Sequence, residues 1–234
     1  MKIRLFTLPN LLTLSNLLCG AMAIVSALVW GDLSTSFWLI VAAAVCDFFD
    51  GMVARLMGIS GPLGVQLDSL ADDISFGLAP STILFVLFGR VNDGTLPEWL
   101  GYTVFLFSAF AALRLAKFNI DEEQHTEFRG LPTPAATLFV VSLGWASEHA
   151  ALIPVTEWVV LATAWVLSLL MISNLPMFSL KFKGLAWRGN EVRLLFVAAS
   201  AALIALLRIE SFLVIIPAYV VVSAVMRVIK GSKS

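Results

Sequence analysis

Five aspartates lie inside or at the end of apolar segments, where an ionised side chain is costly unless something binds it. Asp47 and Asp50 are three residues apart, and Asp68 and Asp72 are four apart. On a helix each pair therefore shares one face. Asp73 is rotated by about 100° from Asp72 around the helix axis, so we expect it to point away from the other four.

Residues 56–67 form a short connection between the two pairs, which makes the two helices antiparallel neighbours and lets the four carboxylates meet at a similar depth. Converging carboxylates repel one another, and Arg55 alone cannot balance four negative charges. Oxygen ligands without histidine or cysteine select hard ions such as Mg²⁺ or Mn²⁺. Four carboxylates suit two such ions, an arrangement that recurs where phosphoryl oxygens are attacked and released.

The composition indicates that these aspartates belong to an integral membrane protein. Apolar residues make up 59% of the 234-residue chain, charged residues only 13%, and the mean hydropathy is +0.93. Soluble proteins carry about 25% charged residues. The net charge of −1 argues against a nucleic-acid partner, which would require a clustered basic excess.

Eight apolar stretches have the length of a membrane-crossing helix, which needs about 20 residues. They are residues 9–30, 33–57, 67–89, 97–118, 134–150, 155–178, 191–207 and 209–229. The chain shows no internal repeat, linker or low-complexity segment. The sequence therefore predicts an all-α, polytopic transmembrane bundle of about eight helices, forming a single domain over residues 1–234.

The distribution of basic residues provides a separate test of this topology. With a cytoplasmic N-terminus and eight alternating helices, only Arg90 and Arg208 fall on the far side of the membrane. The other basic residues are Lys2, Arg4, Arg55, Arg114, Lys117, Arg129, Lys181, Lys183, Arg188, Arg193, Arg227, Lys230 and Lys233. Because positive charge is retained on the cytoplasmic side, this asymmetry predicts eight crossings with both termini cytoplasmic.

A polar stripe marks one face of the first apolar stretch. Asn10, Thr13, Asn16 and Gly20 recur at helical spacing, so we expect them to point toward protein or ligand. The competing interpretation is a signal peptide, but the stretch is too long for its apolar region and no clear cleavage site follows. We therefore predict that this segment is a retained helix.

The spacing of the aspartates also resembles a known signature. Residues 47–72 fill every fixed position of D-x-x-D-G-x-x-A-R-x8-G-x3-D-x3-D, the motif of the CDP-alcohol phosphotransferase family. In that family an alcohol attacks the β-phosphate of a CDP-linked lipid and expels CMP. The resemblance implies that Asp47, Asp50, Asp68 and Asp72 are metal ligands around the diphosphate, with Asp72 also the candidate base for the incoming hydroxyl.

The same resemblance implies a set of CDP-binding residues. They are Gly51, Ala54, Arg55 and Gly64 in the motif and, as a looser inference, Asn10 and Thr13 of the polar stripe. The small residues would let the nucleotide approach the helix backbones, and the guanidinium of Arg55 would contact the nucleotide or its phosphates. Close packing of helices through small residues is the alternative explanation for Gly51, Ala54 and Gly64.

Three further segments are similar to the membrane-embedded phosphatidylserine synthase branch of that family: residues 75–80, 113–119 and 128–136. The resemblance implies CDP-diacylglycerol as donor and L-serine as acceptor. Serine carries a carboxylate, and Arg114, Lys117 and Arg129 fall where cations could bind it. Lys117 stands where this branch usually has arginine, and lysine lacks the bidentate geometry. The retention of basic residues in cytoplasmic loops is the alternative explanation for all three.

The resemblance and the span pattern together give a mechanism and two competing hypotheses. We expect the active site near the cytoplasmic face, with the lipid tails reaching the bilayer between helices, and a homodimer, which is common in the family. One competing hypothesis keeps the chemistry but uses glycerol 3-phosphate or an inositol compound as acceptor. The other is an ion-coupled membrane carrier, although carriers often show internal repeats.

Overall fold

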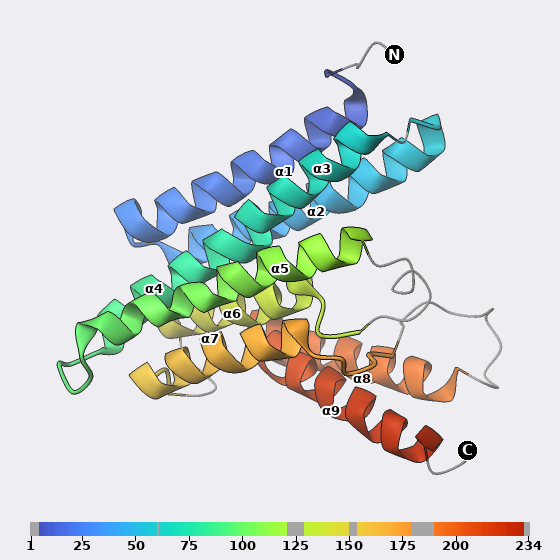
Figure 1. The fold of residues 1–234 in the computed structure, drawn as a ribbon. Helices are drawn as coiled ribbons and strands as arrows, with labels where there is room; N and C mark the ends of the chain where they lie inside the picture. Colours follow the sequence, from blue (N-terminus) through green and yellow to red (C-terminus); the bar gives the residue numbers. More distant parts are fainter. Residues whose placement is uncertain (1–4, 60, 121–128, 150–153, 179–189, 232–234) are drawn as a thin grey trace.

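The computed structural model describes residues 5–59, 61–120, 129–149, 154–178 and 190–231 (Figure 1). Over these residues the chain is helical and has no β-strand, which confirms the predicted all-α class. Lys2, Arg4, Lys181, Lys183, Arg188 and Lys233, used in the charge argument, lie outside the described residues, as does Phe128 of the last similar segment.

The helices follow the predicted apolar stretches. They are α1 (Leu8–Val25) with η1 (Ser26–Trp30), α2 (Leu33–Met57), α3 (Pro62–Asp72) with η2 (Asp73–Leu78) and α4 (Ala79–Val91), η3 (Glu98–Phe105) with α5 (Leu106–Ile120), α6 (Thr133–Glu148), α7 (Glu157–Ile172), and α8 (Glu191–Leu207) with η5 (Arg208–Ser211) and α9 (Phe212–Gly231). Two predicted boundaries were wrong. The third helix begins at Pro62 rather than residue 67 because proline is favoured in the first helical turn, and the sixth ends at Ile172 rather than residue 178.

Five helical segments within the described ranges are long and apolar enough to cross a membrane. They are Leu8–Trp30, Leu33–Met57, Pro62–Val91, Glu98–Ile120 and Glu191–Arg227. The last segment contains a sharp change of direction at Arg208, whose backbone adopts a φ of 51° that non-glycine residues rarely adopt. The helices α6 and α7, with 16 residues each, are shorter.

The helices pack around a shared core. In Figure 1, α1, α2 and α3 lie together at one side, α8 and α9 lie at the opposite side, and α5, α6 and α7 lie between them. The most deeply buried large side chains come from α4, α5, α6 and their neighbours, including Phe76, Ile83, Phe107 and Leu143. This packing brings α1 against both α2 and α3, so α1 can place polar side chains between them.

Charged groups at the start of α2 tie three helices together. Glu148, at the end of α6, accepts hydrogen bonds from the backbone N–H groups of Leu33 and Ser34 (both 2.9 Å) and pairs with Arg90 of α4 (3.0 Å). Asp32 caps the same helix by accepting a bond from the backbone N–H of Thr35 (2.8 Å). The hydroxyl of Thr35 also donates to Asp32 and, as the largest effect, lowers the pKa of its carboxyl group.

Candidate functional site

The predicted carboxylates converge at the other end of α2. Oxygen atoms of Asp47, Asp50 and Asp68 lie within 4.8 Å of one another. Asp72 follows Asp68 by one helical turn on the same face of α3. These four side chains, which we call the carboxylate cluster, come from α2 and α3, as their spacing indicates. Asp73 differs: its buried Oδ1 has no hydrogen-bond partner and lies beside Gly77, on the side of the helix that faces α5.

Helix α1 supplies the polar contacts of the carboxylate cluster. The hydroxyl of Thr13 donates to Asp50 Oδ2 (2.5 Å), and the side-chain amide of Asn16 donates to Asp72 Oδ1 (3.1 Å). Asp50 is only 6% exposed and Asn16 is 0% exposed. The polar stripe therefore points inward, toward the carboxylates, because α1 packs between the two helices that carry them.

The donor set fits a hard divalent cation. The cluster offers carboxylate oxygens only, and the neighbouring Thr13 and Asn16 contribute neutral groups. Arg55 lies close to Asp50 and Asp68, and one guanidinium cannot offset four carboxylates. Oxygen-rich, negatively charged sites of this kind prefer Mg²⁺ or Mn²⁺ to zinc.

A cavity of about 210 Å³ adjoins the carboxylate cluster, and we call it the glycine-lined cavity. It is lined by all six predicted CDP-binding residues, Asn10, Thr13, Gly51, Ala54, Arg55 and Gly64, together with Asp50 and Asp68. A Cβ atom at Gly51 would stand 3.4 Å from Arg55 Nη1, so a side chain there would enter the space beside the guanidinium. The small residues thus leave room at the place where a ligand could reach both the carboxylates and Arg55.

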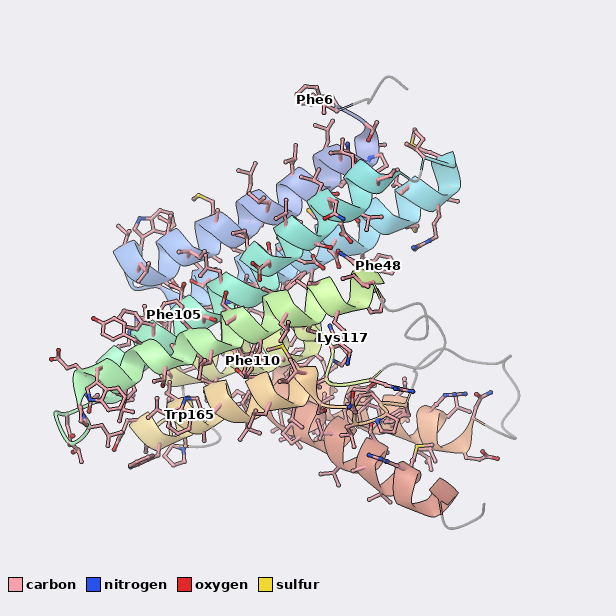
Figure 2. All side chains as sticks on the ribbon, in the orientation of Figure 1. Phe6, Phe48, Phe105, Phe110, Lys117 and Trp165 are labelled. Atoms are coloured by element: carbon pink, nitrogen blue, oxygen red, sulfur yellow. The ribbon has the colours of Figure 1, made fainter. Side chains whose placement is uncertain are left out.

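A second cavity, of about 340 Å³, contains the three predicted acceptor-binding cations, and we call it the basic cavity. Its lining includes Arg114, Lys117 and Arg129, and Lys117 projects from the side of α5 that faces α7 (Figure 2). Arg114 Nη1 also donates to the hydroxyl of Thr133 (2.9 Å), a contact that the sequence did not reveal.

The backbone around Gly130 holds Arg129 in this position. Gly130 has a φ of 78°, and its N–H donates to the carbonyl of Leu175 (2.8 Å). The neighbouring Leu131 N–H donates to the carbonyl of Leu170 (3.0 Å) at the end of α7. A positive φ suits glycine, and a side chain here would collide with the carbonyl of Met171. This segment therefore brings Arg129 to the same cavity as Arg114 and Lys117.

The order of these features along the chain matches a known family. The model of the family described as CDP-alcohol phosphatidyltransferase matches residues 6–170, about two thirds of the chain. The chain belongs to this family. The match includes α1 to α6 and most of α7, and so it contains the carboxylate cluster and every residue of the glycine-lined cavity.

Individual relatives carry a more specific name. The chain is 38% identical over 175 residues to the CDP-diacylglycerol–serine O-phosphatidyltransferase of Helicobacter pylori, with 73% of this chain and 71% of that protein aligned. A Bacillus subtilis protein of the same name is 36% identical over 139 residues (59% and 75%), and one from Methanocaldococcus jannaschii is 34% identical over 138 residues (59% and 60%).

The chain also has an apolar cavity of about 590 Å³ along α2. Its lining runs from Phe37 and Trp38, near the start of α2, to Phe48 and Phe49, which stand between Asp47 and Asp50 in the sequence. Residues of α8, η5 and α9 close its other side. The sequence predicts these later helices only as apolar spans, because the way they pack against α2 has no local sequence pattern.

Proposed function

We propose that this chain transfers the phosphatidyl group of CDP-diacylglycerol to L-serine, which gives phosphatidylserine and CMP for phospholipid synthesis. The family membership and the printed names of the relatives support this activity. One structural observation carries it: the carboxylate cluster lies between the glycine-lined cavity and the helix that carries the basic cavity. Asp50 and Asp68 line the glycine-lined cavity, and η2, which begins directly after Asp72, packs against α5, the helix that carries Arg114 and Lys117.

The glycine-lined cavity is the proposed site of the CDP moiety. Gly51, Ala54 and Gly64 leave the helix backbones accessible, and Arg55 presents a guanidinium whose planar donors suit phosphate oxygens. Asn10 and Thr13 face the same cavity from α1. A nucleotide held there has its diphosphate beside the carboxylate cluster.

Asp47, Asp50, Asp68 and Asp72 are the proposed ligands of two Mg²⁺ or Mn²⁺ ions. When bound, such ions neutralise the diphosphate and stabilise the departing CMP. Asp72 then takes the proton from the serine hydroxyl, whose oxygen forms a new bond to the β-phosphorus as the bond from that phosphorus to CMP breaks. Asp72 suits this role because it is the last member of the cluster on α3, directly before η2, which packs against the helix that carries Arg114.

The basic cavity is the proposed site of the serine carboxylate. Arg114, Lys117 and Arg129 come from α5 and from the segment before α6, and together they give this cavity a positive charge. Arg114 is oriented by its bond to Thr133, and the helix that carries it packs against η2 directly after Asp72, so that it can hold the carboxylate of serine on this side of the cluster. An acceptor without a negative charge would lose this attraction.

The membrane arrangement is also a proposal. We place eight helices across the bilayer, with both termini and the carboxylate cluster at the cytoplasmic face, in a single domain over residues 1–234. Arg90, beside Glu148, and Arg55, near the cluster, lie at opposite ends of α2, as this arrangement requires. The apolar cavity would receive a lipid tail from the side, and a homodimer stays a prediction.

One assay tests the reaction. Purified protein receives CDP-diacylglycerol, Mn²⁺ or Mg²⁺, and one acceptor at a time, and CMP release is followed. We expect release that depends on L-serine and exceeds that with glycerol 3-phosphate or inositol. Release with another acceptor alone would reassign the acceptor. Release that is independent of any acceptor would contradict the transfer to serine, and no release with any of them would favour the carrier hypothesis.

A further inference from the structure

Asn16 makes a contact that sets it apart from the rest of the polar stripe. It is fully buried on α1, and its side-chain Nδ2 donates to Asp72 Oδ1 at 3.1 Å across 56 residues of sequence. Its Oδ1 atom is buried and has no hydrogen-bond partner. Asn10 and Thr13 line the glycine-lined cavity, but Asn16 does not. The side chain of Asn16 therefore donates to a carboxylate and does not line the glycine-lined cavity.

The backbone of α1 is fixed against the helix that carries Asp72. The hydroxyl of Ser75 donates to the carbonyl oxygen of Asn16 (2.9 Å). One turn further on, Gly20 approaches so closely that a Cβ atom there would lie 2.7 Å from Ser75 Cα. Ser75 belongs to η2, a π-helical segment that begins directly after Asp72, and such segments frequently occur at functional sites.

We propose that Asn16 is a positioning residue for Asp72. The orientation of its amide follows from the chemistry, because the reversed amide would point a carbonyl oxygen at a carboxylate. The N–H bond to Oδ1 fixes the orientation of the Asp72 carboxylate, and with it the direction in which this carboxylate meets the acceptor hydroxyl. This inference rests on the proposed function, in which Asp72 is the base, and it adds the residue that orients this base.

The test compares Asn16→Ala and Asn16→Asp with Ser15→Ala. Ser15 is the neighbouring residue, and its hydroxyl donates only to the carbonyl of Leu11 in its own helix. Misplacing a catalytic group by about 1 Å can reduce the rate about 100-fold. We therefore expect the kcat of serine-dependent CMP release to fall roughly 30- to 100-fold in Asn16→Ala and further in Asn16→Asp, where two carboxylates would face each other, while Ser15→Ala behaves like the wild type.

Two measurements that do not depend on turnover separate positioning from other roles. Calorimetric binding of CDP-diacylglycerol and the midpoint of thermal unfolding should change little in Asn16→Ala, and KM values for both substrates should stay within about threefold. Weaker binding of CDP-diacylglycerol with an unchanged kcat would show a nucleotide contact instead. A large drop in the unfolding midpoint in Asn16→Ala, in proportion to the lost kcat, would show a purely structural role. Either result overturns the proposal.

Failure of the proposed function would appear in the wild-type protein rather than in the Asn16 variants. Wild-type protein that releases CMP only with an acceptor other than serine would contradict the serine assignment, and the same comparison of variants with that acceptor would still decide the role of Asn16. Wild-type protein that releases no CMP with any acceptor would overturn both. If Asn16→Ala has the same kcat as the wild type, only the positioning role of Asn16 is overturned.

Discussion

The two ends of α2 carry acidic groups in opposite situations. At its start, Glu148 and Asp32 are bound by backbone N–H groups, by hydroxyls and by Arg90. Near its other end, Asp47 and Asp50 face further carboxylates, and Thr13 is the hydroxyl that donates to Asp50. Along the helix, Asp50 is about 25 Å from Leu33, at which α2 begins. Charged groups at the first end hold helices together, whereas those at the second end repel one another.

This difference separates structural from functional charge. Charge-assisted hydrogen bonds to backbone N–H groups are among the strongest in proteins, and at the start of α2 they connect α2, α4 and α6. Carboxylates that converge without such donors reduce the stability of the empty protein, and proteins retain such sites where function requires them. The carboxylate cluster therefore has the character of a cation-binding site.

The largest expected effect is on turnover. Asp68→Asn removes one ligand charge from the carboxylate cluster and should reduce CMP release at least about 100-fold, as expected for the loss of one electrostatic contact to a developing charge. Asp50→Ala and Asp68→Ala should abolish it. Glu148→Gln is the matched control, because it makes the same chemical change at the opposite end of α2. Substantial activity in the Asp50 or Asp68 variants would remove these residues from the proposed metal site.

Stability in the absence of metal should respond in opposite directions at the two ends. Asp68→Asn relieves repulsion, so its unfolding midpoint in a chelator should be above that of the wild type, whereas the midpoint of Glu148→Gln should be below it. Mn²⁺ at about 100 times its Kd should stabilise the wild type by about 2.7 kcal/mol and Asp68→Asn by less. A cluster variant that is no more stable than the wild type without metal would contradict the repulsion.

The contacts at the start of α2 should affect the unfolding free energy and leave turnover almost unchanged. Glu148→Gln weakens three hydrogen bonds and the pair with Arg90, and we expect a loss of about 1–3 kcal/mol of unfolding free energy. The KM and kcat of the proposed transfer should stay within about threefold of the wild type, because this end lies far from the carboxylates. A strong loss of kcat in Glu148→Gln without a loss of stability would show that the start of α2 affects the carboxylate cluster, and would contradict the separation of the two ends.

The sequence predicts the converging carboxylates near the end of α2 better than the contacts of Glu148 and Asp32 at its start. The convergence of Asp47, Asp50 and Asp68 follows from helical spacing and a short connection, both of which are local. The same holds for the small residues of the glycine-lined cavity. Long apolar stretches likewise predicted helices, because a chain in lipid must satisfy its backbone groups internally.

Contacts between distant segments could not be predicted from the sequence. The bonds from Leu33 and Ser34 to Glu148 join residues more than 110 positions apart, and the bond from Asn16 to Asp72 spans 56. The close approach of Gly20 and Ser75 that fixes Asn16 depends on how α1 crosses η2. Each polar residue was visible in the sequence, but its partner was set by tertiary packing.

The smallest expected effect is a pH dependence at the start of α2. Hydrogen bonds from the hydroxyl and the backbone N–H of Thr35 lower the pKa of Asp32 in the folded protein below its ordinary value of about 3.9. A carboxyl group with a lowered folded pKa stabilises the fold fully above its unfolded pKa and loses this contribution as the pH falls through the folded value.

Asp32→Asn keeps a capping oxygen but does not titrate, so its stability should change less than that of the wild type when the pH is lowered from about 6 to about 3. Because a cap contributes about 1 kcal/mol, the difference in unfolding free energy should not exceed that amount. Equal slopes in the two proteins would mean that Asp32 is not held by Thr35, and the start of α2 would then rely on Glu148 alone.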